Sequence, residues 1–308
     1  MKERYISMRA FFTLVRNKLE YEKLRHKKKR NLNKLKKSKV SVCSIDETIA
    51  YLVENNASLA RFGDGEIDLI MEQSIHFQTA SPELSRKMQA VINSHGQDPR
   101  MMIAIPDIMN YGAVFRPKAK NFWDEYLSLN AGKWLKYLKK DIPYFNAHVT
   151  RLYMDWADKS QTPGWYQAIK KVWDGRKVLI IEGEKSRLGV GNDLFDNVAD
   201  LKRILCPNRN AYAHYDAVLQ QVKQFDRSTL ILLALGPTAT IMAYDLHHVG
   251  FQAVDVGHID IEYSWFLAGA VEKQHVPGKY IAESKGGGVV ADIYDSVYEA
   301  QILGRYGC

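Results

Sequence analysis

The chain has 308 residues, of which 46% are hydrophobic and 25% charged, and its net charge is +8 at neutral pH. This composition is ordinary for a globular domain, and no apolar run approaches the roughly 18 to 20 residues that a membrane span needs. The first residues also lack a signal-peptide pattern. The three cysteines are odd in number and far apart, which argues against a disulfide framework or a zinc knuckle. We therefore expect a protein of the reducing cytoplasm.

The positive charge is concentrated in residues 1–40, which hold 15 Lys or Arg against 3 Asp or Glu, whereas the rest of the chain is slightly acidic. Apolar residues recur on roughly one helical face before the basic run, at Met8, Phe11, Phe12, Val15 and Leu19. We expect residues 1–40 to form a basic amphipathic arm that docks on an anionic membrane surface or an acidic partner. A solvated or coiled-coil helix is the alternative. A domain over 41–308 follows this arm. Nucleic acid is not an expected partner, because neither the arm nor the acidic body offers a base-reading module.

The sequence of the first half of that domain predicts alternating helices and strands. A capping box at Ser44–Glu47 predicts a helix to about Asn55, and the apolar run that follows predicts a strand over 58–62. Further along, we expect a helix over 81–93, a strand over 101–105 and helical structure between 117 and 140.

The second half contains four short runs rich in Val, Ile and Leu, which predict strands over 177–182, 201–206, 229–235 and 252–256. Segments of helical or turn character separate them, as in a parallel, doubly wound α/β sheet of Rossmann-like type. Each run ends in a polar or glycine-rich loop. Ligands of open α/β sheets bind beyond the carboxyl ends of the strands, so these loops are expected to line one crevice.

A pair of carboxylates follows the first predicted strand, in Gly63-Asp64-Gly65-Glu66. Mg²⁺ and Mn²⁺ take oxygen ligands, and Mg²⁺ sites often combine one or two carboxylates with substrate phosphates. The pattern thus indicates a metal site for a substrate that carries a diphosphate. Taken alone it fits an exposed turn with two solvated acids better, because Asp-Gly is a common turn dipeptide.

Two of the second-half loops have phosphate-binding character. Gly236-Pro237-Thr238 opens a helix directly after a strand, where backbone N–H groups and the Thr238 hydroxyl can meet a phosphate, although a plain helix cap has the same pattern. Arg187 lies in a glycine-containing loop and can pair with a diphosphate. The loop lacks the glycine spacing of a nicotinamide-binding fingerprint, and no Walker-type Gly-Lys-Ser/Thr occurs.

The order of these motifs resembles the GT-D glycosyltransferases, a bacterial family first described as a domain of unknown function. The blocks that carry the resemblance are RFGDGE at 61–66 with Phe77-Gln78 downstream, EG at 182–183, SRLGVGNDLF at 186–195, LGPTA at 235–239 and DVGHIDIEY at 255–263. The resemblance as a whole extends from about residue 44 to 288, and the basic arm falls outside it.

The resemblance implies a metal-dependent enzyme that transfers a hexose from a nucleotide diphosphate sugar, typically a UDP-hexose, to a growing glycan. It places Asp64 and Glu66 at the metal, Mn²⁺ or Mg²⁺, and at the donor diphosphate, as catalytic residues. Further donor-binding candidates are Arg61, Arg187, Asn192, Gly236, Pro237, Thr238, His258 and Asp260. Arg61 can instead form a salt bridge, and His258 and Asp260 can complete the metal shell or contact the sugar.

Glu262 is a candidate general base for the acceptor hydroxyl, although acids on helices are more often structural. Lys279 and Lys285 lie in loops that could close over the donor. The expected acceptor belongs to glycoprotein or cell-surface polysaccharide synthesis, and the basic arm points to a lipid-linked or membrane-proximal saccharide at the inner membrane face. Two other functions remain open, a non-catalytic nucleotide-sugar-binding regulator and a membrane-associated scaffold.

Overall fold

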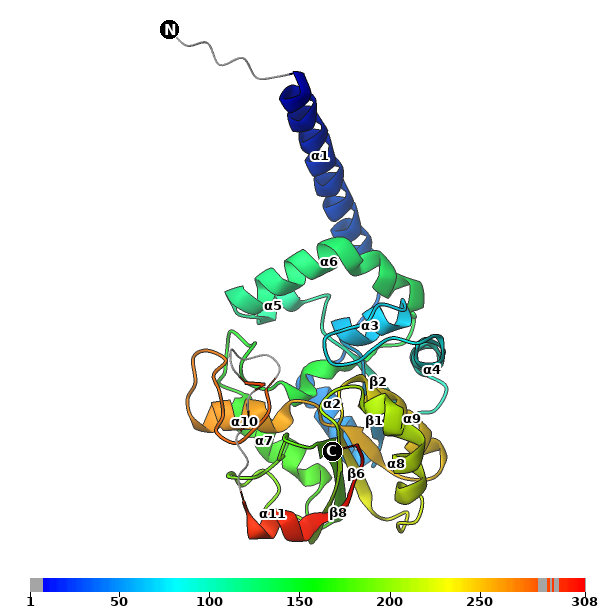
Figure 1. The fold of residues 1–308 in the computed structure, drawn as a ribbon, viewed down its shortest axis with the longest axis vertical. Coiled ribbons are helices and arrows are strands. Elements are labelled where there is room, and N and C mark those ends of the chain that lie inside the picture. The colour runs from blue at the N-terminus through cyan, green and yellow to red at the C-terminus, as the bar shows by residue number, and fades with distance from the viewer. Residues whose placement is uncertain (1–7, 282–286, 289, 291–293, 308) are drawn as a thin grey trace.

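The computed structural model describes residues 8–281, 287–288, 290 and 294–307, with residues 8–19 and 21 described by their backbone only. The side chains of the apolar face expected at Met8–Leu19, and the loop lysine Lys285, therefore lie outside the described residues. Figure 1 shows one α/β body from which a long helix projects.

Eight parallel strands form a single sheet in the order β3-β2-β1-β7-β6-β4-β5-β8. The strands are β1 Ser58–Arg61, β2 Met101–Ile105, β3 Phe145–Asn146, β4 Lys177–Gly183, β5 Asp200–Cys206, β6 Leu230–Ala234, β7 Ala253–Asp255 and β8 Ile302–Arg305. The predicted α/β class with a mostly parallel sheet is confirmed. The central strands are buried along nearly their whole length, because helices cover both faces of a parallel sheet.

Helices connect the strands on both faces. They are α1 Met8–Lys36, α2 Ile45–Glu54, α3 Asp64–Ile70, α4 Pro82–Asn93, α5 Tyr111–Val114, α6 Pro117–Tyr137, α7 Thr162–Ile169, α8 Tyr215–Val222, α9 Pro237–His248, α10 Ile259–Leu267 and α11 Ser296–Gln301. The predicted starts of α2 and α4 are confirmed by their caps. Ser44 and Glu47 form a reciprocal capping box, and the Ser81 hydroxyl accepts from the Leu84 N–H.

The shortest strands escaped the sequence analysis. β3 has two residues, and β8 is an edge strand of partly exposed residues, so neither gives an apolar run. Another difference concerns the acid motif: α3 begins at Asp64 itself, so the two acids lie in the first turn of a helix and not in a free turn.

In the basic arm, α1 is one continuous helix over Met8–Lys36, and its C-terminal end packs on the body. Asn31 donates through Nδ2 to the backbone oxygen of Ser128 in α6 at 2.9 Å, and Leu35 and Val40 belong to the main core. The N-terminal part of α1 projects away from the body (Figure 1). Within the described residues, no helix is both long enough and apolar enough to cross a bilayer.

Candidate active site

The predicted site loops gather at the carboxyl edge of the sheet. β1, β7, β6 and β4 are consecutive neighbours in the sheet, so the loops that follow them start side by side. Contacts between loops confirm the gathering: the Gly189 N–H after β4 donates to Asp260 after β7 at 2.8 Å, and Arg61 at the end of β1 reaches Asp255 at the end of β7.

The acid motif combines one exposed and one half-buried carboxylate. Asp64 is exposed at the first position of α3, whereas Glu66 turns back and accepts the Gly63 N–H through Oε2 at 2.6 Å. Burial, with smaller contributions from the Asp255 and Asp64 carboxylates, raises the pKa of Glu66 to about 7 despite that hydrogen bond. The motif is therefore a close group of acids whose mutual repulsion a cation would relieve.

Arg61 is fixed beside this motif by Asp255. Its guanidinium donates to Asp255 Oδ1 at 2.7 Å and to the backbone oxygen of the same residue at 3.0 Å. The guanidinium also lies against Gly257, where a Cβ would fall 1.9 Å from Nη2. Gly257 has φ +44°, so its lack of a side chain serves both the backbone conformation and the approach of Arg61.

The loop after β6 begins α9 as predicted. Gly236 is the N-cap residue with φ +54°, and Pro237 takes the first helical position. Thr238 and Thr240 are both fully buried, but their hydroxyls differ. Thr240 Oγ1 donates to the backbone oxygen of Arg61 at 2.8 Å, whereas Thr238 Oγ1 has no partner among the described residues. A buried hydroxyl without a partner at a helix N-terminus has the character of a ligand group.

Asn192 and Asp260 hold two loops together. Asp260 is buried, and its Oδ1 accepts both the Gly189 N–H and the Asn192 Nδ2–H, the latter at 2.7 Å. Its Oδ2 accepts from Lys279 Nζ at 2.6 Å. All these contacts are internal, so the geometry gives Asp260, Asn192 and Lys279 a structural role, and their contact with donor or metal stays a prediction.

Arg187 is likewise engaged within the protein. Its side chain is buried, its φ is +49°, and Nη1 donates to the backbone oxygen of Gly278 at 2.6 Å. Glu182 at the end of β4 holds the same loop, because it accepts the Leu188 N–H. Glu182 also forms a buried ion pair with Arg203 of β5. Arg187 thus ties the loop after β4 to the segment around Gly278.

Glu262 lies in α10 and is fully buried. Its Oε2 accepts the N–H groups of Tyr153 and Met154 at 3.1 and 2.7 Å, and its Oε1 has no partner among the described residues. Burial raises the pKa of Glu262 to about 7, although the nearby Arg151 guanidinium lowers it. This carboxyl fixes the backbone of the segment that follows β3.

That segment supplies site residues that the sequence analysis missed. Arg151 Nη2 lies 3.3 Å from His258 Nδ1, and an ion pair of 3.9 Å joins Arg151 to Asp155. His148 is buried nearby, and burial lowers its pKa to about 3, so its ring is neutral. The segment has no periodic pattern around it, so only the spatial position of His258 reveals its place in the site.

Asp64 and Glu66 can hold a divalent cation only together with other ligands. The described residues contain no cluster of three or more His, Cys, Asp or Glu side chains arranged for a metal. Two carboxylates match a Mg²⁺ or Mn²⁺ site whose remaining positions are filled by waters and substrate phosphates. The residues present therefore fit a cation that is bound by the protein and by substrate phosphates together.

A family model described as "Glycosyltransferase GT-D fold" matches residues 59–284 of the chain, which include all of these site residues. The chain belongs to the GT-D fold family of glycosyltransferases. The resemblance noted from the motifs is thereby confirmed, together with the fold and the enzyme class.

Two curated streptococcal relatives are similar over most of this GT-D chain. A probable glycosyl transferase Gly of Streptococcus gordonii is 39% identical over 264 residues, and glycosyltransferase GlyD of Streptococcus pneumoniae serotype 4 is 37% identical over 266 residues. Each alignment covers 86% of this chain but only 38% and 32% of the respective relative. The chain therefore spans only about a third of the length of these two relatives.

Solved structures match the GT-D chain along nearly their whole length. One, described as a highly conserved domain of unknown function with a distinct glycosyltransferase fold, has a TM-score of 0.85 and 34% identity, and the match covers 90% of this chain and all of that one. Another, a new glycosyltransferase from Streptococcus sanguinis, has a TM-score of 0.82 and 38% identity over 86% of this chain and 99% of that one.

Proposed function

We propose that this chain transfers a hexose from a nucleotide diphosphate sugar, a UDP-hexose, to a growing glycan with the help of Mn²⁺ or Mg²⁺. The observation that carries the proposal is the pairing of Asp64 and Glu66 in the first turn of α3, next to the fixed guanidinium of Arg61. Acids beside a cationic group at the carboxyl edge of a parallel sheet suit a metal-bound diphosphate.

Asp64 and Glu66 would hold the cation through their carboxylate oxygens, and Glu66 Oε2 accepts the Gly63 N–H in this structure. The bound metal supplies neutralisation of the charge that develops on the departing diphosphate. Glu66 must be ionised to act as a ligand, and a nearby cation favours that state.

The N-terminus of α9 is the proposed phosphate contact of the protein itself. Pro237 has no N–H, and the Ala239 N–H donates to the Gly236 backbone oxygen at 2.9 Å. The candidate ligand groups are therefore the Thr238 N–H and the Thr238 hydroxyl, which is buried without a partner among the described residues. Gly236 has φ +54°, and a Cβ there would fall 3.1 Å from the Phe77 ring, so glycine at this position suits both the backbone and the packing of Phe77.

Glu262 and His258 shape the opposite side of the site. His258 is linked to Arg151, and Glu262 holds Tyr153 and Met154 in place. We propose that this side contacts the sugar or acceptor through His258 and Arg151. A role of Glu262 as general base stays a prediction, because both hydrogen bonds of this buried carboxyl are made to backbone.

The proposed acceptor is a glycan of glycoprotein or cell-surface polysaccharide synthesis, carried on a lipid or near a membrane. A donor screen tests the proposal: the purified chain is incubated with Mn²⁺, a panel of UDP-sugars and acceptor glycans, and released UDP is measured. One UDP-hexose is expected to give release above the others. Binding of a UDP-sugar without any release would favour the non-catalytic regulator instead.

A further inference from the structure

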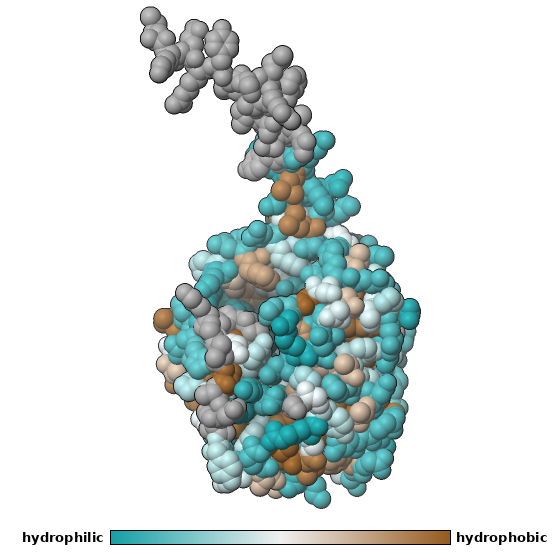
Figure 2. Space-filling model, in the orientation of Figure 1, coloured by the Kyte–Doolittle hydropathy of each residue, from teal (hydrophilic) through white to brown (hydrophobic). Residues whose placement is uncertain are grey.

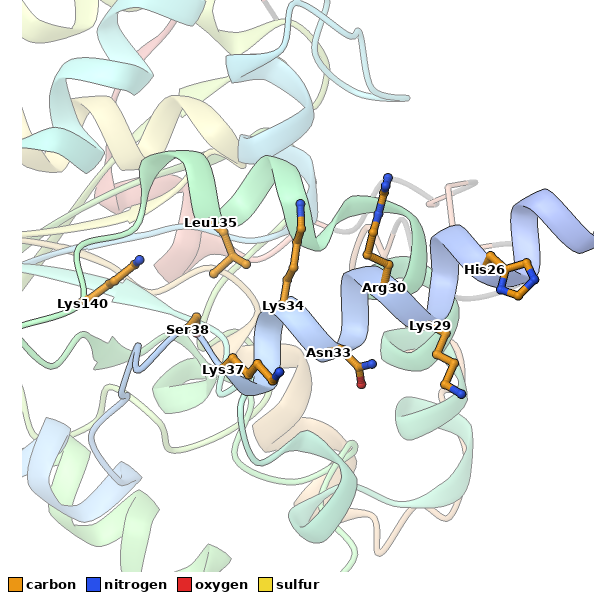
Figure 3. Close-up of a pocket in the computed structure, with 9 residues that line it drawn as sticks. All are labelled: His26, Lys29, Arg30, Asn33, Lys34, Lys37, Ser38, Leu135 and Lys140. Carbon is orange, nitrogen blue, oxygen red and sulfur yellow. The ribbon is translucent and has the colours of Figure 1, made fainter.

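A basic groove lies on the side of the body where α1 joins it. A cavity of about 560 Å³ opens between α1 and the C-terminal end of α6. Figure 3 shows the side chains that line it. Among them are Lys29, Arg30 and Lys34 of α1, Lys37 directly after it, Leu135 of α6 and Lys140 beyond the end of α6. We call this set the basic groove.

The charge of the basic groove is not balanced locally. Its five cationic side chains are exposed, and none of them forms an ion pair with an acidic residue in the described part of the chain. The described lining contains no Asp or Glu. Five like charges around one cavity repel one another unless an anion binds between them.

Apolar side chains are exposed on the same two helices. Leu24 of α1 is 41% exposed, and Phe122 and Leu129 of α6 are 49% and 39% exposed. Figure 2 shows hydrophobic atoms on the stretch of α1 that rises from the body. Asn31 of α1 also donates to the Leu129 backbone oxygen at 3.3 Å, so Leu129 lies where the two helices meet.

We propose that the basic groove binds the phosphate headgroups of an anionic membrane. Basic residues attract the surface of an anionic bilayer, and the exposed Leu and Phe side chains of the same two helices, which lie outside the lining, can add apolar contact with its interface. A groove for single-stranded nucleic acid would need aromatic side chains among the cations for base stacking, and the described lining has no aromatic ring apart from His26. A cluster of cations without acidic side chains or stacking groups thus favours the lipid surface.

This surface is connected to the site through α6. On one side α6 receives Asn31 of α1, and on another its Tyr126 hydroxyl donates to the backbone oxygen of Asp64 at 3.4 Å. Lys133 of α6 further contacts Asp68 of α3 at 3.2 Å. A helix with its side chains is about 10 Å wide, so membrane and acid motif would be separated by little more than one helix. The inference concerns binding alone and does not depend on the proposed donor.

Vesicle sedimentation with the full chain tests the proposal. Wild type should pellet with phosphatidylglycerol–phosphatidylcholine vesicles at low salt, and not with phosphatidylcholine alone. Lys29→Gln, Lys34→Gln and Lys37→Gln together should lower the partition coefficient roughly 100-fold, at about fivefold per lysine. The matched control removes three charges from the same helix outside the basic groove, Lys23→Gln, Lys28→Gln and Lys36→Gln, and should lose far less.

A second pair of variants tests the groove without touching the arm. Lys140→Gln should lower the partition coefficient about fivefold, whereas Lys136→Gln, an exposed α6 lysine outside the lining, should leave it nearly unchanged. If the partition coefficient falls equally in both triple variants, or equally in both single variants, general positive charge and not the groove causes the binding. Either result would overturn the proposal.

The remaining outcomes separate the sources of phosphate. If inorganic phosphate binds the wild-type groove and the triple groove variant loses that binding, while wild type does not pellet with anionic vesicles, the groove is a small-anion site and the membrane assignment is wrong. Groove-dependent binding to duplex DNA without vesicle binding would overturn it as well. Circular dichroism of every variant should match wild type, since all the substituted side chains lie at the surface.

Discussion

The Lys279 ammonium lies 2.6 Å from Oδ2 of Asp260, and both side chains are almost completely buried. The other carboxylate oxygen accepts from Gly189 and Asn192. One buried carboxylate therefore joins α10, the loop after β4 and the segment that contains Lys279. Removal of either charge leaves the other unpaired in the interior, which is costly.

Lys279→Met should lower the free energy of unfolding by about 3 to 5 kcal/mol, because Asp260 loses its counter-ion inside the protein. Urea denaturation measures the change. The double variant Lys279→Met with Asp260→Asn should recover much of the loss, since it removes both buried charges.

Lys118→Met is the matched control, because Lys118 and Glu272 form an ion pair of similar length, 2.8 Å, with both side chains exposed. Its loss should stay below about 1 kcal/mol. Equal effects of the two lysine substitutions would contradict the structural role of the buried pair.

Gly257→Ala should disturb Arg61 as well as the backbone. Both Gly257 and Gly269 have positive φ, but only at Gly257 does an added Cβ meet a neighbour, the Arg61 guanidinium. Gly269→Ala should cost about 1 kcal/mol for the backbone alone. Gly257→Ala should cost roughly 2 kcal/mol more, since Arg61 must leave buried Asp255. Similar unfolding free energies for the two variants would refute the contact.

Glu262 should make stability depend on pH. A free glutamate titrates near 4.3, whereas burial raises the pKa of Glu262 to about 7. Between these values the folded state keeps a proton that the unfolded state has lost, so stability falls as pH rises from about 4.3 to 7 and levels off above.

Glu262→Gln removes this titration while its amide oxygen can still accept from Tyr153 and Met154. Relative to wild type, the variant should gain up to roughly 3 kcal/mol of unfolding free energy between pH 4.3 and 7. Denaturation curves at several pH values measure the difference. A constant difference across this range would show that Glu262 titrates normally in the folded protein.

Thr238 and Thr240 offer a comparison within one helix. Thr240→Val should cost about 1 kcal/mol, because its hydroxyl bonds to the Arg61 backbone. Thr238→Val should cost no stability, because its hydroxyl has no described partner, yet it should raise the donor KM about tenfold if the hydroxyl meets a donor phosphate. An unchanged KM with lowered stability would assign Thr238 a purely structural role.

The sheet was largely predictable because parallel strands leave continuous apolar runs. β2 spans the predicted residues 101–105, and β4 to β7 lie within a residue or two of their predicted runs. β3 and β8 were missed because two residues, or a half-exposed edge, carry no such run. Local capping signals at Ser44, Ser81 and Gly236 located helix starts equally well.

The site was predictable as a set of loops, but the partners of each side chain were not. Arg187 stands in a loop that was expected to bind phosphate, and Asp260 in the first turn of α10, yet Arg187 bonds to Gly278 and Asp260 to Lys279, both distant in sequence. Arg151 and His148 were missed because no sequence motif marks them. Only the fold brings their segment to His258.

The most direct test of the account is metal-dependent release of UDP from a UDP-hexose by wild type, Asp64→Asn and Glu66→Gln. The account predicts release by wild type with Mn²⁺ or Mg²⁺, loss of release in EDTA, and a decrease of at least about 100-fold in both variants, which should remain folded. Undiminished release in EDTA, or by either variant, would contradict the assignment of Asp64 and Glu66 to the metal and the donor diphosphate.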